Sequence, residues 1–135
     1  MEFFYVIADN TLGEAGLLPF MPITIIHSQK RLNYFGLLDT GATVNVLPFS
    51  IGNELGLEWE EQSTQLNLSG NLSGFEAKAV ILKSQISDFP EVRLAFAWTR
   101  PDNVPLILGQ TNFFMEFDVC FFRSRLGFDV KPKIK

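Results

Sequence analysis

The fold and the chemistry of this chain are decided by residues 37–48, which read LLDTGATVNVLP. In this stretch an acidic residue, Asp39, follows two apolar residues that are typical of a buried strand, and it opens a tight Thr-Gly turn. Burying a carboxylate without a partner is costly, so its position needs a reason. Taken alone, such a turn is explained by the bonds that an Asp side chain makes to neighbouring backbone amides. The rest of the sequence decides whether the turn has a chemical role as well.

The sequence on both sides of this stretch has the patterns of short β-strands. Apolar runs that alternate with polar residues, or that are rich in β-branched residues, predict strands where turn residues bound them. Residues 22–38 are expected to form one hairpin and residues 117–130 another. The predicted strands are residues 3–8, 22–27, 34–38, 62–68, 75–82, 92–98, 104–108, 117–122 and 126–130.

Helical signals occur at only two places. Residues 48–55 begin with Pro48 and are followed by Gly56, which are typical of the start of a helix and of the position just past its end. Residues 111–115 follow Gly109, with Thr111 as the candidate N-cap. Many short strands and two short helices indicate an all-β fold, a small closed or folded-over β-barrel. Since there is no repeat and no linker, we expect one domain over residues 1–135.

The composition excludes several classes of protein. Hydrophobic residues make up 47% of the 135 residues, and 14 Phe supply ample core, which excludes a disordered chain. A net charge of −4 argues against a nucleic-acid partner, because binding phosphates needs clustered Lys and Arg. One Cys and one His fall short of the usual zinc sets, so we expect no metal and no cofactor, although a carboxylate-only metal site stays formally open.

No segment has the pattern of a membrane span or a secretory signal. The most apolar early stretch, residues 16–26, is too short to span a bilayer and contains two prolines. No Lys or Arg precedes Lys30, so a basic signal region is missing. We expect a soluble, cytoplasmic protein without a membrane partner. His27, in a predicted strand, is expected to be a structural or surface residue and not a catalyst, and Cys120, among phenylalanines, is expected to be a buried and inert thiol.

Three motifs occur in order along the chain. The first is Asp39-Thr40-Gly41-Ala42 after two apolar residues, followed by VNVLP at residues 44–48. The second is the Gly-rich stretch LSGNLSGF at residues 68–75, and the third is LILG at residues 106–109. Together they resemble the motifs of the retropepsin-like aspartic proteases, the single-domain retroviral type, in which the second corresponds to the flexible flap and the third backs the active-site loop. The ordered set is more specific than any one of the motifs.

This resemblance implies a retropepsin-type barrel with a flap hairpin over the active site, and it implies an aspartic endopeptidase. In that family, hydrolysis uses two carboxylates that share one proton around a water. The chain contains one Asp-Thr-Gly, so the second carboxylate must come from another copy. The expected state is a C2 homodimer with Asp39 of each subunit on the axis. Its substrate would be an extended peptide, lying as an added strand under the flaps.

The resemblance also implies roles for residues near Asp39, which would itself be catalytic. Thr40 would bond across the dimer axis, Gly41 would let the backbone pass close to the carboxylates, and Ala42 would leave room for substrate. The expected flap residues are Ser69, Gly70, Asn71, Leu72, Ser73, Gly74 and Phe75. Residues expected to line the substrate site or support the loop are Leu106, Ile107, Leu108 and Gly109, with Ala42, Leu72, Phe75 and Ile107 as pocket walls.

Two residues depart from the family pattern. Gln110 follows Gly109 where family members often carry Arg or Asp, and Asn45 stands where a Ser or Thr is common. These departures keep a rival function open, a catalytically inactive binding or assembly module with the same fold. A third alternative is an enzyme that is active only in a larger assembly or after residues 1 to about 20 are trimmed.

Overall fold

The structure is a computed structural model that describes residues 1–9, 15–68 and 70–134. Its strands are β1 (Glu2–Phe4), β2 (Val6–Asp9), β3 (Ala15–Leu18), β4 (Phe20–His27), β5 (Lys30–Leu38), β6 (Asn45–Leu47), β7 (Gln65–Leu66), β8 (Ala77–Gln85), β9 (Val92–Thr99), β10 (Ile107–Leu108), β11 (Phe117–Phe122) and β12 (Gly127–Pro132). Its helices are α1 (Phe49–Glu54) and α2 (Phe113–Glu116), with 3₁₀ helices η1 (Trp59–Glu61), η2 (Gly70–Leu72) and η3 (Arg123–Arg125).

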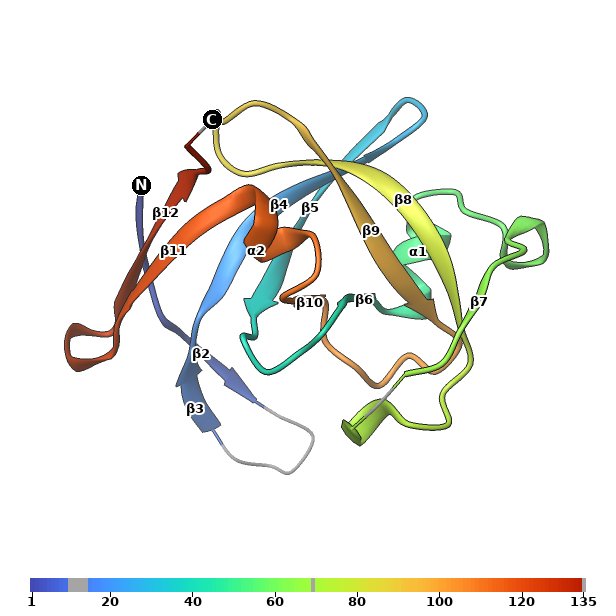
Figure 1. Cartoon of the computed structure of the whole chain (residues 1–135), viewed down its shortest axis with the longest axis horizontal. Coiled ribbons are helices and arrows are strands. Elements are labelled where there is room, and N and C mark those ends of the chain that lie inside the picture. The colour runs from blue at the N-terminus through green and yellow to red at the C-terminus, as the bar shows by residue number, and fades with distance from the viewer. Residues whose placement is uncertain (10–14, 69, 135) are drawn as a thin grey trace.

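A closed barrel forms the centre of the molecule (Figure 1). Its strands follow the order β4-β5-β10-β6-β9-β8, and β8 returns to pair with β4. The closing pairs are Thr24↔Gln85, Ile25↔Ser84 and Ile26↔Lys83. This pairing leaves no free edge among the six barrel strands, and it confirms the predicted all-β barrel. The short strand β7 is attached to β8 outside the ring.

The core fills the barrel because its strands alternate between inward and outward side chains. In β8, for example, Val80 and Leu82 are buried while Ile81 and Lys83 are exposed. Bulky aromatic side chains complete the packing, and α2 contributes one of them to the barrel interior. The largest fully buried side chains are Trp98, Phe96, Phe113 and Phe128.

Two parallel pairings bring distant loops together at one end of the barrel. Strand β10 runs parallel to β5, with Ile107↔Leu37 and Leu108↔Leu38 in register. Strand β6 runs parallel to β9 and antiparallel to β10. Because β5 and β10 are parallel neighbours, the loops that follow them leave the sheet at the same edge. Figure 1 shows the loop after β5 at the same end of the barrel as the segment beyond β7.

A second, three-stranded sheet in the order β1-β12-β11 lies beside the barrel (Figure 1). Its β11–β12 hairpin was predicted, whereas its third strand comes from the other end of the chain. The predicted strand over residues 3–8 is divided at Tyr5, whose N–H donates to the carbonyl of Leu126 at 2.8 Å. As a result, β1 pairs with β12 and β2 pairs with β3.

The prediction of a strand over residues 62–68 is wrong for most of its length. Only Gln65–Leu66 is a strand, and the 3₁₀ helix η1 lies shortly before it. Trp59, the first residue of η1, packs in an aromatic cluster with Phe49 and Trp98, at ring-centroid distances of 5.8 and 5.2 Å. The predicted strand over residues 104–108 is likewise reduced to Ile107–Leu108.

Both predicted helices are present, and the structure differs from the prediction at the N-cap of the second. The first ends as expected, with Gly56 at a φ of +86° just beyond it. In the second, Asn112 and not Thr111 stands at the N-cap position, so the predicted cap is wrong. No helix in the described part of the chain is long and apolar enough to cross a membrane.

The expectation that Cys120 is buried is also wrong, because its side chain is exposed. Strand β11 is an edge strand of the three-stranded sheet, and its side chains alternate between the two faces of that sheet. Phe117 and Phe121 pack toward the core, which leaves Cys120 on the outer face.

Candidate active site

Asp39 is the first residue after β5, at the end of the barrel where the parallel strands finish. Its backbone N–H donates to the carbonyl of Leu108 at 3.0 Å, which extends the β5–β10 pairing by one residue. Its side-chain Oδ1 accepts the N–H of Gly41 at 2.9 Å, and its carbonyl accepts the N–H of Ala42 at 3.1 Å. The carboxylate is therefore held in a tight turn by its own backbone. We call residues 39–43 the active-site loop.

The segment after β10 supports this loop through three hydrogen bonds. The N–H of Gln110 donates to the carbonyl of Ala42 at 2.9 Å, and the N–H of Thr111 donates to that of Thr43 at 2.8 Å. The Gln110 side chain adds a third bond, from Nε2 to the carbonyl of Thr40 at 2.8 Å. We call residues 109–112 the support segment. The support segment thus holds the active-site loop by hydrogen bonds to three of its backbone carbonyls.

Gly109 and Asn45 connect the support segment to the barrel. The side chain of Asn45 is fully buried, and its Oδ1 accepts the N–H of Gly109 at 2.8 Å. A Cβ atom on Gly109 would lie 2.5 Å from the carbonyl oxygen of Val44 and 2.9 Å from that of Ala42. Only glycine fits such a close approach of two backbones. Asn45, noted in the sequence as a departure from the family pattern, therefore makes a hydrogen bond of its own.

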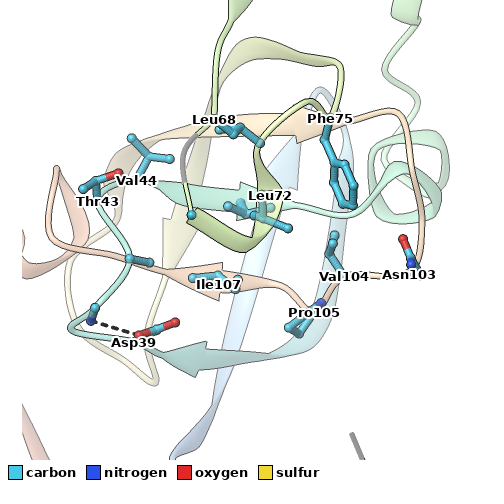
Figure 2. A pocket seen from close by; sticks show the side chains of 14 residues that line it. Asp39, Thr43, Val44, Leu68, Leu72, Phe75, Asn103, Val104, Pro105 and Ile107 are labelled. Atoms are coloured by element: carbon cyan, nitrogen blue, oxygen red, sulfur yellow. Dashed lines mark hydrogen bonds between the residues drawn. The ribbon is translucent and has the colours of Figure 1, made fainter. Parts of the chain in front are cut away.

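A cleft of about 570 Å³ opens beside Asp39. A cleft of this size, lined by apolar side chains together with a comparable area of polar surface, can hold a ligand. Figure 2 shows Leu72 and Phe75 on the flap side of the cleft, with Asp39, Ile107 and Pro105 on the other side. The lining residues are Asp39, Gly41, Ala42, Thr43, Val44, Val46, Leu68, Gly70, Leu72, Phe75, Asn103, Val104, Pro105 and Ile107.

The structure brings seven of the sequence-predicted site residues together in this cleft and leaves others outside it. The expected pocket walls Ala42, Leu72, Phe75 and Ile107 all line the cleft. The residues that line it with them, among those predicted, are Asp39, Gly41 and Gly70. The remaining predicted residues have other positions or are not described: Thr40, Ser73 and Gly74 are exposed, Leu106 and Leu108 are in the core, Gly109 is buried behind the loop, Ser69 lies outside the described residues, and the Asn71 side chain does as well.

Sequence reasoning missed the contribution of residues 103–105 to the cleft. Val104 and Pro105 line it, as does Asn103, although residues 104–108 were predicted to be a buried strand. Pro105 is the signal that could have shortened that strand, because proline cannot donate a ladder hydrogen bond. It marks the point at which the chain is still a loop.

At the position predicted for the flap, β7 and the start of β8 form a short arm, which we call the flap arm. Strand β7 pairs with β8 at Gln65↔Lys78 and Leu66↔Ala77 only. Beyond these pairs, the described residues 67–68 and 70–76 form what we call the flap tip, which contains η2. Two of its backbone bonds are local, from Ser73 N–H to Gly70 O and from Phe75 N–H to Leu72 O, both at 3.1 Å, and at its end the Glu76 carbonyl accepts the N–H of Arg100 at 2.9 Å.

The charge of the cleft is simple. Among the described lining residues, Asp39 is the only ionisable side chain. No group of three or more His, Cys, Asp or Glu in the described ranges lies close enough to hold a metal ion. One carboxylate in this cleft can act as a base, and the described lining residues supply no second ionisable group that could act as an acid beside it.

Comparison with known proteins supports the identification of the fold. No protein-family model matches the chain, and no curated protein sequence matches it. Among solved structures, it is similar to a retropepsin-like aspartic protease from Rickettsia conorii, with a TM-score of 0.63 and 15% identity over 95% of this chain and 88% of that one. It also matches the EIAV protease complexed with the inhibitor HBY-793, at a TM-score of 0.47 and 22% identity over 76% of this chain and 88% of that one. The first of these likenesses shows that the chain has a retropepsin-like fold.

Proposed function

We propose that this retropepsin-like chain is an aspartic endopeptidase that acts as a C2 homodimer. The observation that carries the proposal is the position of Asp39, the only ionisable side chain among the described residues that line the cleft. Its turn stands at one end of the barrel, where the support segment holds it from behind. A second copy related by a two-fold axis near Asp39 would supply the missing carboxylate.

The chemistry follows from two carboxylates at one axis. Two carboxylates about 3 Å apart do not both ionise, so one Asp39 keeps a proton while the other stays charged, as in known aspartic proteases. The charged carboxylate removes a proton from a water, and the water oxygen bonds to the peptide carbonyl carbon. The protonated carboxyl gives its proton to the carbonyl oxygen. The carbon–nitrogen bond of the resulting diol then breaks as the amine nitrogen takes up a proton.

The cleft favours an extended peptide as the substrate. Its apolar walls, including Leu72, Phe75 and Ile107, suit apolar side chains of a peptide that lies between the flap tip and the barrel. A peptide in this position can form strand-like hydrogen bonds, with alternate side chains in pockets. Closure of the flap tip would exclude bulk water from the two carboxylates.

The test is cleavage of a mixed peptide library between about pH 4 and 7 by the wild type and by Asp39→Asn. Asparagine keeps an oxygen that can accept the N–H of Gly41, so the turn and the fold are expected to persist, as circular dichroism would verify. Cleavage by the wild type alone supports the proposal. Equal cleavage by both proteins overturns it, because the activity would not need Asp39.

A second measurement addresses the rival, a binding or assembly module without turnover. Sedimentation equilibrium at micromolar concentration is expected to give a dimer, which peptide-like inhibitors with a transition-state hydroxyl, such as pepstatin, should stabilise. A stable dimer that neither cleaves peptides nor binds such an inhibitor would favour the rival function.

A further inference from the structure

We infer that Gln110 and Asn112 are positioning residues that hold Asp39 in place through neutral amide hydrogen bonds. The inference rests on the proposed function for its kinetic readout, whereas the structural readout described below does not depend on it. Neither side chain lines the cleft, so each acts through the support segment and not on a substrate.

The backbone at Asn112 has an unusual conformation. Its φ is 78° and its ψ is −58°, and the N–H of Phe113 donates to the carbonyl of Thr111 at 3.1 Å. These values describe a γ-turn with a positive φ, which is rare and strained for a residue other than glycine. Strained backbone of this kind persists only where surrounding contacts require it. The side chain of Asn112 makes such contacts.

Asn112 fastens the support segment to β9. Its Oδ1 accepts the N–H of Ala95 at 2.6 Å, and its Nδ2 donates to the carbonyl of Arg93 at 3.3 Å. Ala95 directly precedes Phe96, where the pairing of β9 with β6 begins. The Asn45 side chain takes the remaining polar group of Ala95, because its Nδ2 donates to that carbonyl at 3.0 Å. Two asparagine side chains thus continue the sheet beyond the end of β6.

The connection from Asn112 to Asp39 is short and continuous. The two residues before Asn112 make all three bonds from the support segment to the carbonyls of the active-site loop, at Thr40, Ala42 and Thr43. The Gln110 side chain holds the carbonyl of the residue that directly follows Asp39. A shift of the support segment would therefore move the turn that orients the carboxylate.

All of these side chains are uncharged amides, which do not titrate in the range where a carboxylate pair works. Among the described hydrogen-bond partners of the support segment, the only charged residue is Arg93, which takes part through its backbone carbonyl. The bonds that Gln110 and Asn112 make are therefore independent of pH. A carboxylate in their place would lose or gain a charge within the working range of the enzyme.

The first test replaces Asn112 by glycine. Glycine adopts a φ of 78° without strain, so Asn112→Gly keeps the turn and removes both side-chain bonds. In assays at a temperature well below the unfolding midpoint of the variant, we expect kcat to fall by about 10- to 100-fold, with KM little changed. An unchanged kcat would overturn the inference for Asn112, because a purely conformational role predicts no loss with glycine.

The second test distinguishes two effects at position 110: the loss of the hydrogen bond to Thr40 and the introduction of a charge. In Gln110→Met the bond to Thr40 is lost at every pH, so the rate should fall by a similar factor throughout. In Gln110→Glu an ionised carboxylate would face the Thr40 carbonyl, so the rate relative to wild type should fall further as the pH rises through about 4 to 5. Identical pH profiles for the wild type and Gln110→Glu would overturn the inference for Gln110.

A matched control is Gln62, whose Nε2 also donates to a backbone carbonyl, that of Glu58 at 3.1 Å. It does not line the cleft, so Gln62→Met should cleave peptides at the wild-type rate.

Amide hydrogen exchange gives the readout that does not need activity. In Asn112→Gly, the amides of Gln110 and Thr111 should exchange faster than in the wild type, while that of Val80 in β8 should not. Unchanged exchange at Gln110 and Thr111 would overturn the inference even if the chain proved not to be a protease.

Discussion

The active-site loop and the flap tip lie on opposite sides of one cleft, yet they are held in different ways. The loop accepts hydrogen bonds from residues about 70 positions later in the chain, as the bond from Gln110 to Thr40 illustrates. The flap tip follows two strand pairs, and among its described residues two backbone bonds connect residues three apart while one long-range bond runs from the Arg100 N–H to the Glu76 carbonyl at its end. The described tip therefore has fewer long-range backbone bonds than the active-site loop. We call the side of the cleft with the active-site loop the anchored wall, and we expect the flap tip to open more readily than this wall.

The largest loss of stability is expected at Gly109, where the backbone behind the active-site loop is most crowded. Gly109→Ala would place a methyl group against two backbone carbonyls that cannot move without disturbing the active-site loop. We expect the free energy of unfolding to fall by about 3 kcal/mol, measured by urea denaturation. Gly16→Ala is the control, because a Cβ there meets nothing within 4 Å and should change stability by less than about 0.5 kcal/mol. Equal effects for the two variants would contradict this picture of the loop.

The next effect is expected at Asn45, which joins the anchored wall to the barrel. Asn45→Ala would leave the buried N–H of Gly109 without its acceptor, which costs about 2 kcal/mol. The exposed Asn33, whose Oδ1 accepts a bond from Thr24 at 2.8 Å, is the control, and Asn33→Ala should cost less than about 0.5 kcal/mol. Urea denaturation of both variants makes the comparison. A loss for Asn45→Ala no larger than for Asn33→Ala would mean that water replaces the bond.

A smaller effect is expected in the flap tip. Gly74 has a φ of +86°, a conformation that a residue with a side chain adopts at a cost of about 1 kcal/mol. Gly74→Ala should lower the free energy of unfolding by no more than that amount, while hydrogen exchange at Phe75 becomes faster. Ser73→Ala, at the neighbouring exposed position, should change neither quantity. A loss as large as that for Gly109→Ala would show that the tip is as firmly anchored as the loop.

The smallest effect on stability is expected at Glu61 in η1, which precedes the flap arm in the sequence. A hydrogen bond with Glu58, followed by the repulsion between the two charges, raises the pKa of Glu61 above its ordinary value. The folded state therefore holds the proton of Glu61 more tightly than the unfolded state does. The resulting stability is present at low pH and is lost as the pH rises through the raised pKa.

Glu61→Gln should for this reason raise the unfolding midpoint slightly near pH 7 and leave it unchanged near pH 3. Thermal unfolding at the two pH values measures the difference. Glu60→Gln removes the same charge from the same 3₁₀ helix and serves as the control. An equal shift of Glu61→Gln at both pH values would contradict the assigned cause.

Much of this fold could be predicted from local patterns, because those patterns act over a few residues. The hairpin of β4 and β5 follows from a β-branched run and an apolar run on the two sides of a polar turn, and α1 follows from Pro48 and Gly56. The turn at Asp39 also follows from its neighbours in sequence. The resemblance of residues 68–75 to a flap located the arm, and that of residues 106–109 located the strand beside the loop.

The rest depends on contacts between distant residues. Strand β6 consists of three buried residues and pairs with β9 and β10 on its two sides. No local sequence pattern predicts this strand. Trp59 in η1 packs against Phe49 and Trp98, which come from other elements, and Cys120 is exposed because it lies on the outer face of β11. The bonds of Asn45 and Asn112 likewise join segments about 50 and 17 residues apart. Amide side chains carry no sequence signal for partners at such separations.

The aromatic cluster at the root of the flap arm contains both tryptophans of the chain, Trp59 and Trp98. Their rings are 5.2 Å apart at an angle of 67°, close enough for their electronic transitions to couple. Trp59 lies just before the flap arm, whereas Trp98 belongs to the barrel wall. Near-ultraviolet circular dichroism and intrinsic fluorescence should therefore report on the junction between the flap arm and the barrel. A change at this junction could be followed without attaching a label.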